Sequence, residues 1–253
     1  MKPDSLYIAI LVTVLLVCVC HALFAQAPKA DVHPFVTSEK FAGYKLAWAE
    51  EFNGKALDTE LWSYHDGQAH NVSVADGRLR MTGGRIISKW TFKYGYYEAR
   101  IKCPAGKGWQ TAFRLAFNRD AGEKPQAAQQ EIGICEQDSS TPRGYAVSIQ
   151  QWLPAHKAIA AVHIDTPDLS KDFHIWGCEF TPKQARFFFD GKLVASKDVS
   201  SFPHDEMSIL LASTATGQTG KGNGAGAQVD WVRCYEQEGG TGADWVCPCE
   251  QEK

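Results

Sequence analysis

The sequence has no long stretch in which apolar residues recur with helical spacing, no internal repeat and no cluster of basic residues. The first two absences argue against helical bundles and repeat arrays. The third, together with a formal net charge of −3, makes the chain a poor nucleic-acid binder. We therefore expect no nucleic-acid partner and a fold built from short β-forming segments.

A metal-ligand pattern is also missing. Cys247 and Cys249 form a close pair, but no second close pair and no neighbouring histidine accompany them. A structural zinc site needs four such ligands, so we predict no metal site and no required cofactor. Six cysteines follow the N-terminal apolar run, and in an exported chain they could form disulfides whose pairing the sequence does not decide: Cys103, Cys135, Cys178, Cys234, Cys247 and Cys249.

Only the N-terminus is apolar enough to cross a membrane. Lys2 precedes an apolar run over Ile8–Cys20, and the small residues Ala25 and Ala27 follow it. This pattern predicts a secretory signal peptide over residues 1–27 and a secreted or periplasmic protein, with no membrane contact after cleavage. Two alternatives remain open: cleavage after Ala25, or retention of the segment as an anchor, since Leu6–Ala27 approaches spanning length.

The remainder of the chain is predicted to hold one domain. Residues 28–42 lack a clear periodicity and are expected to be a linker, and residues 239–253 are expected to be a tail outside the core. Between them lies the predicted domain, residues 43–238. Hydrophobic residues make up 44% of the chain and aromatic residues 11%, which suffices for the core of one large domain. We expect a monomer.

Turn signals divide this domain into short strands. Asp76-Gly77 separates two strand-like runs within Val72–Met81, and Asp190-Gly191 does the same within Arg186–Val194. Asp-Gly pairs tolerate the positive φ of tight hairpin turns. Tyr94–Lys102 alternates in the manner of a strand with one solvent-exposed face. Many short strands with such turns predict an all-β sandwich of two antiparallel sheets.

Glu131 and Glu136 lie in one β-forming segment, five residues apart. In a regular strand such residues point to opposite faces. A bulge between Gly133 and Cys135 would reverse this parity and aim both carboxylates to one side, as a two-carboxylate glycosidase requires. Without further context, the alternative is that both glutamates are solvated surface residues.

The context is supplied by motifs that occur in a fixed order along the chain. With them the sequence resembles glycoside hydrolase family 16, which implies a concanavalin-like jelly-roll sandwich with a concave substrate cleft. The family consists of exported, endo-acting enzymes that cut β-linked polysaccharides. Besides the Glu131 segment, the motifs are Trp48–Gly54, Tyr94–Lys102, Gly106–Gly108, Phe173–Pro182 and Val229–Arg233.

The resemblance assigns roles to the two glutamates. By position in the family's Glu-x-Asp-x-x-Glu signature, Glu131 is the nucleophile and Glu136 the general acid and base of a retaining reaction. Gly133 stands where the family has the middle aspartate. Losing one hydrogen bond to a charged group costs roughly 1.5–3 kcal/mol, about ten- to a hundredfold in rate. We therefore expect weakened turnover.

Four further residues are predicted to contact substrate. Arg114 stands where relatives usually have a platform tryptophan, and it would bind a carboxylate or sulfate of a charged polysaccharide or, equally, pair with an acidic residue of the domain. Gln150 stands where relatives often carry a histidine near the cleft. Trp109 and Trp152 are candidates for stacking on sugar rings, although most tryptophans of a β-sandwich simply pack in its core.

The predicted function is retaining hydrolysis of O-glycosidic bonds in a β-linked polysaccharide, weakened by loss of the middle acid. The alternative is a non-catalytic carbohydrate-binding protein on the same fold, and a transglycosylase would share the covalent intermediate. Some relatives hold a structural calcium away from the cleft, but no local acidic cluster assigns one here.

Overall fold

The computed structural model describes residues 43–65, 69–117, 129–216, 226–237 and 245–246. The predicted signal peptide and linker lie outside these residues, as do Cys247 and Cys249. Apart from one turn of 3-10 helix over Ala69–Asn71, the regular structure is β. Within the described ranges, no helix is long and apolar enough to span a membrane.

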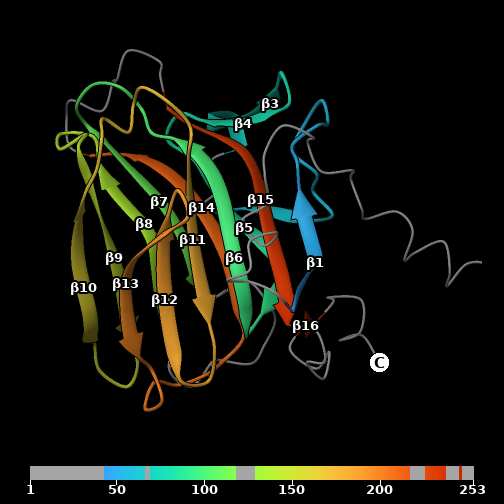
Figure 1. Ribbon diagram of the computed structural model, residues 1–253. Coiled ribbons are helices and arrows are strands. Elements are labelled where there is room, and N and C mark those ends of the chain that lie inside the picture. Colours follow the sequence, from blue (N-terminus) through green and yellow to red (C-terminus); the bar gives the residue numbers. More distant parts are fainter. Residues whose placement is uncertain (1–42, 66–68, 118–128, 217–225, 238–244, 247–253) are drawn as a thin grey trace, which may run out of the picture.

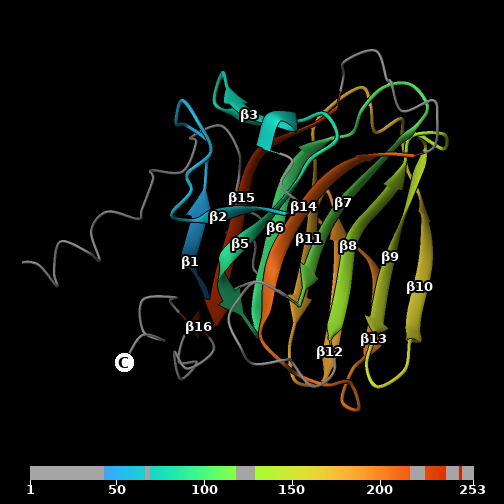
Figure 2. The ribbon, with the colours of Figure 1, turned by 180° about the vertical axis from the view of Figure 1, so that it is seen from behind.

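The strands form two eight-stranded antiparallel sheets that pack face to face, which confirms the predicted sandwich (Figures 1 and 2). Sheet A has the order β13-β12-β11-β6-β15-β4-β3, and β1 also pairs with β15. Its strands are β1 (Tyr44–Glu50), β3 (Val72–Ala75), β4 (Arg78–Met81), β6 (Gly95–Lys102), β11 (His174–Phe180), β12 (Gln184–Phe189), β13 (Lys192–Asp198) and β15 (Ala227–Gln237).

Sheet B has the order β10-β9-β8-β7-β14-β5-β16, and β2 also pairs with β5. Figure 2 shows β7, β8 and β9 of this sheet side by side. Its strands are β2 (Trp62–His65), β5 (Arg85–Phe92), β7 (Trp109–Ala116), β8 (Gln130–Asp138), β9 (Gly144–Gln151), β10 (Lys157–Asp165), β14 (Met207–Ala215) and β16 (Trp245–Val246).

Both predicted hairpins are confirmed. Asp76 and Gly77 join β3 to β4 with φ values of 54° and 66°, and Asp190 and Gly191 join β12 to β13 with 41° and 82°. Two successive positive φ values are what a two-residue hairpin of the right twist requires. The predicted tail differs in one respect, because its residues 245–246 pair with β5 and extend sheet B.

The core lies between the sheets and consists of apolar side chains from the inward positions of both. Trp62, Trp176 and Trp231 are fully buried. The four described cysteines are buried free thiols, so the structure joins none of them to another in a disulfide: Cys103, Cys135, Cys178 and Cys234.

The outer face of sheet A corrects one expectation. Tyr96 and Glu98 of β6 were predicted on a solvent-exposed face, but they are 1% and 0% exposed. Neighbouring side chains cover them, and the hydroxyl of Tyr235 donates a hydrogen bond to Glu98 over 2.8 Å. Alternation identifies the two faces of a strand, but it does not reveal whether other side chains cover the outer one.

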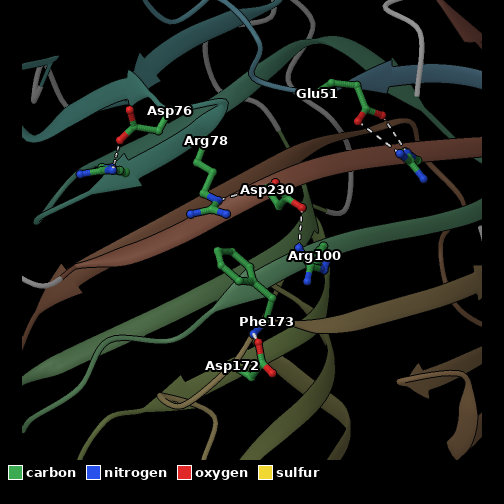
Figure 3. A network of polar contacts seen from close by, with 9 residues as sticks. Glu51, Asp76, Arg78, Arg100, Asp172, Phe173 and Asp230 are labelled. Carbon is green, nitrogen blue, oxygen red and sulfur yellow. Dashed lines mark hydrogen bonds and ion pairs between the residues drawn. The ribbon is translucent and has the colours of Figure 1, made fainter. Parts of the chain in front are cut away.

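Ion pairs continue along this outer face (Figure 3). Asp230 lies between two arginines, at 2.6 Å from Arg100 and 3.9 Å from Arg78. Both guanidinium groups also lie over the ring of Phe173, at 4.7 and 5.0 Å from its centre. Cation–π contacts of this kind anchor the segment before β11 to the sheet.

Candidate active site

The predicted bulge is present in β8, at the position that the two glutamates require. Along β7, Phe113 lies opposite Cys135 and the next residue, Arg114, lies opposite Gly133, so Ile134 is the extra residue of β8. The register between β8 and β9 shifts over the same segment. Ile134 and Cys135 both belong to the core, because the bulge turns two consecutive side chains inward.

The parity reversal places Glu131 and Glu136 on the same side of sheet B. Glu131 lies opposite Ala116 and Glu136 opposite Ala112. Those two alanines are four residues apart in the regular strand β7 and therefore share a face. We call this face, which points away from sheet A, the site face. It also carries Arg114, which lies midway between the two alanines.

Arg114 joins the two carboxylates. One terminal nitrogen of its guanidinium lies 2.6 Å from a carboxylate oxygen of Glu136. The other lies 3.3 and 3.4 Å from the two oxygens of Glu131. The side chains of Arg114, Glu131 and Glu136 are only 23%, 9% and 15% exposed, so these charges interact in a partly desolvated environment.

Burial and charge act against each other at Glu136. Burial raises the pKa of its carboxyl above the ordinary value, Arg114 lowers it, and Glu131 raises it further, so that the net direction is upward. For the guanidinium of Arg114, burial disfavours the charge, but Glu136 and Glu131 outweigh it and raise the pKa. The site therefore combines a permanently charged arginine with a carboxyl that is easier to protonate than an exposed one.

Gly133 lies on the site face between the two glutamates, opposite Ser148 of β9. A Cβ atom at this position would lie 2.5 Å from both Oε1 of Glu136 and Oγ of Ser148. The carboxylate of Glu136 thus occupies part of the space that a longer residue 133 would need. The sequence reasoning missed Ser148, although its place two residues before Gln150 on a strand puts both on one face.

Gln150 lies directly opposite Glu131 in the ladder between β8 and β9. Its side-chain oxygen lies 2.9 Å from Nε2 of His156. The His156 ring stacks on Trp152, with ring centres 4.5 Å apart, and Trp152 is 40% exposed. The structure therefore brings together Glu131, Gln150 and, through His156, the predicted platform Trp152. His156 follows the site strand in sequence, but a lone histidine is not a specific signal.

Trp109 is not brought to this face. It lies five residues before Arg114 in regular β7, so it points to the opposite side of the sheet, and it is 3% exposed. A buried indole has no free face for a sugar ring. The structure thus corrects the expectation that Trp109 lines the cleft, because the inward parity of β7 places it in the interior.

No group of three or more His, Cys, Asp or Glu side chains in the described part of the chain could hold a metal ion. Two carboxylates presented together on the solvent side of one sheet are the arrangement that glycoside hydrolases use. The chain belongs to the glycosyl hydrolases family 16, whose family model matches residues 50–233. Family membership is thus shown over nearly all of the described sandwich.

Individual relatives are distant. Glucan endo-1,3-beta-glucosidase A1 of Niallia circulans is 24% identical over 269 residues, which cover 80% of this chain and 39% of that protein. A beta-1,3-glucan-binding protein of Penaeus monodon is 28% identical over 146 residues, 52% of this chain and 38% of that protein. The chain thus spans about two fifths of the length of each.

Among solved structures, the laminarinase from Flavobacterium sp. UMI-01 has the same fold. It superimposes with a TM-score of 0.65 at 24% sequence identity, over 76% of this chain and 100% of that one. At this identity the likeness concerns the fold alone.

Proposed function

We propose that the chain is an exported endo-acting β-glycanase that hydrolyses its substrate with retention, using Glu131 as nucleophile and Glu136 as general acid and base. The observation that carries this proposal is the bulge in β8, which brings both carboxylates to the site face. The two groups share one guanidinium. Such closeness favours a retaining pair, at about 5–5.5 Å, over an inverting pair that leaves room for water between its carboxyls.

In the first step, a carboxylate oxygen of Glu131 bonds to the anomeric carbon while the bond from that carbon to the leaving oxygen breaks. Glu136 gives its proton to the leaving oxygen. In the second step, water gives a proton to Glu136 and attacks the anomeric carbon, and Glu131 is released as a carboxylate. Glu136 must be protonated at the start, and the upward direction of its pKa supports this role.

The charges at the site favour a neutral glycan. When both glutamates are ionised, two negative charges face the single positive charge of Arg114. Both ends of its guanidinium fork contact these glutamates, so a sulfate or carboxylate of the substrate would compete with them. A neutral β-glucan, the glycan printed in the names of the relatives from Niallia circulans and Penaeus monodon, meets no such cost.

A second candidate function, glycan binding without turnover, has a specific observation in its favour. Arg114 bridges the two carboxylates, whereas a retaining reaction requires the anomeric carbon to lie between them. Gly133 also supplies no acid to the site. A relative named as a glucan-binding protein is compatible with this alternative. A transglycosylase would differ only in the acceptor, a sugar hydroxyl in place of water.

Hydrolysis is tested by incubating the purified chain with laminarin, lichenan, agarose, carrageenan and porphyran and measuring new reducing ends. We expect products from a neutral β-glucan, formed by the unchanged chain but not by Glu131→Gln. A matched control is Glu60→Gln, because Glu60 is exposed and far from β8 in sequence. Glycan binding without any Glu131-dependent product would contradict the enzyme proposal and support the binding protein.

The role of Glu136 has its own test. Glu136→Ala should lose activity on glucans, because their leaving sugar oxygen needs a proton. With an aryl β-glycoside, whose leaving group needs no proton, the variant should still form the glycosyl-enzyme, and added azide should restore turnover by attacking this intermediate, which no longer has a general base. The product should be a glycosyl azide with the retained anomeric configuration. An azide product of inverted configuration would refute the covalent intermediate on Glu131.

A further inference from the structure

Arg114 is the charged residue that distinguishes this site from a simple carboxylate pair. Its guanidinium bridges Glu131 and Glu136, and its own Nε is buried without a hydrogen-bond partner. The guanidinium group therefore does not have all of its donors satisfied. Its position depends mainly on the ion pairs with the two carboxylates.

We propose that Arg114 is a positioning residue, an internal counter-ion that draws Glu136 over Gly133 and closes the catalytic pair until a glycan displaces it. This inference rests on the proposed function, because it concerns the same two glutamates. It extends that function by assigning to this chain a self-bridged resting state.

The space around Gly133 supports the proposal. Oε1 of Glu136 lies only 2.5 Å from where a Cβ of residue 133 would be, while its other oxygen, Oε2, contacts Arg114 at 2.6 Å. The bridged position of Glu136 is therefore compatible with glycine at position 133. The glycine and the arginine fit each other, and a side chain at 133 would push the glutamate away.

The charges that face Glu136 are few. Arg114 comes from β7, and Glu131 and the exposed Asp138 come from β8. β9 contributes the uncharged residues Ala146 and Ser148, and beyond Ala146 lies the exposed His163 of β10. On the far side of β7, β14 places Leu210 opposite Arg114. Among the described residues of these strands, Arg114 is thus the one positive charge on the site face next to Glu136.

Two consequences follow from this arrangement. A nearby positive charge favours the ionised form of a carboxyl by about 1–3 pH units. Arg114 therefore acts against the burial that raises the pKa of Glu136, and it narrows the pH range in which Glu136 can protonate the leaving oxygen. The same guanidinium must also leave the space between the carboxylates before the sugar can react. Removing it should therefore extend activity to higher pH and raise kcat/KM at neutral pH.

The test compares the unchanged chain with Arg114→Met, which has a similar length and no charge, and with Arg114→Lys. Lysine keeps the charge but loses the planar fork that contacts both carboxylates. For Arg114→Met we expect the basic limb of the pH profile of kcat/KM to move up by about one pH unit or more. At pH 7 we expect a gain of about tenfold. Arg114→Lys should keep the basic limb of the unchanged chain.

An unchanged basic limb in Arg114→Met, with folding confirmed by circular dichroism and thermal melting, would overturn the proposal. If no variant forms Glu131-dependent product, the proposed hydrolysis fails, but the counter-ion remains testable by carbon NMR. The carboxyl carbon of Glu136 should then titrate at higher pH in Arg114→Met than in the unchanged chain. Titration at the same pH in both would refute the role of Arg114 independently of activity.

Discussion

Replacement of Glu98 by glutamine should make the protein more stable at neutral and basic pH. Glu98 is fully buried on the outer face of sheet A, and burial raises the pKa of its carboxyl from 4.5 to about 7. The hydrogen bond from Tyr235 and the charge of Arg233 act in the opposite direction but do not cancel the effect of burial.

The sign follows from proton binding. Between pH 4.5 and about 7, Glu98 holds a proton in the folded chain but has lost it in the unfolded chain. The folded state binds more protons, so the free energy of unfolding falls as the pH rises through this interval. At about 1.4 kcal/mol per pH unit, the free energy of unfolding falls by about 3 kcal/mol across this interval, and the fall is complete above pH 7. Glutamine stays neutral and avoids it.

The measurement is urea unfolding at pH 5, 6, 7 and 8 for the unchanged chain and for Glu98→Gln. Near pH 5 the two should be similar, whereas at pH 8 the variant should be more stable by up to about 3 kcal/mol. In thermal melting this is a rise of roughly 6–12 °C for a domain of this size. Glu60→Gln, at an exposed position, is the control. A difference that does not change with pH would refute the reasoning.

Two further changes test the binding face and the buried ion pair. Trp152→Ala should raise KM for glucan oligosaccharides several-fold, since an aromatic contact contributes about 0.5–1.5 kcal/mol. The control is Leu153→Ala, and an equal KM for the two variants would exclude Trp152 as a platform for the sugar ring. Glu51→Gln should cost about 3–5 kcal/mol in urea unfolding, because it leaves the 1%-exposed Arg233 without its charge partner at 2.8 Å. Glu51→Gln with Arg233→Met should recover most of this loss, and a single-variant loss below about 1 kcal/mol would contradict the argument.

Local geometry was predictable from the sequence where a backbone conformation allows only a few residue types. The Asp-Gly pairs mark the hairpins at residues 76–77 and 190–191, because few other residues accept two positive φ values in succession. The bulge in β8 was predictable as well, since the spacing of Glu131 and Glu136 gives one face only if one extra residue interrupts the alternation.

Contacts across the sheet were not predictable in the same way. The sequence allowed Arg114 either a substrate anion or an acidic partner, and only the register of β7 against β8 places it between Glu131 and Glu136. The prediction that Trp109 lines the cleft was wrong, because the direction of its side chain depends on the position of Trp109 along β7, and the sequence does not show where this strand begins. The burial of Glu98 depends on side chains of β15, which lies far away in sequence.

The place of β15 in sheet A has a consequence for how the chain folds as it is synthesised. Among the described strands, β15 connects β6 to β4 and also holds β1, and its Arg233 pairs with a glutamate 182 residues earlier. Until the ribosome has made residues 227–237, the early strands β1, β3 and β4 have no link to β6 in the sheet. Pairing over such distances along the chain is slow, so we expect sheet A to assemble only after nearly all of the domain has been translated.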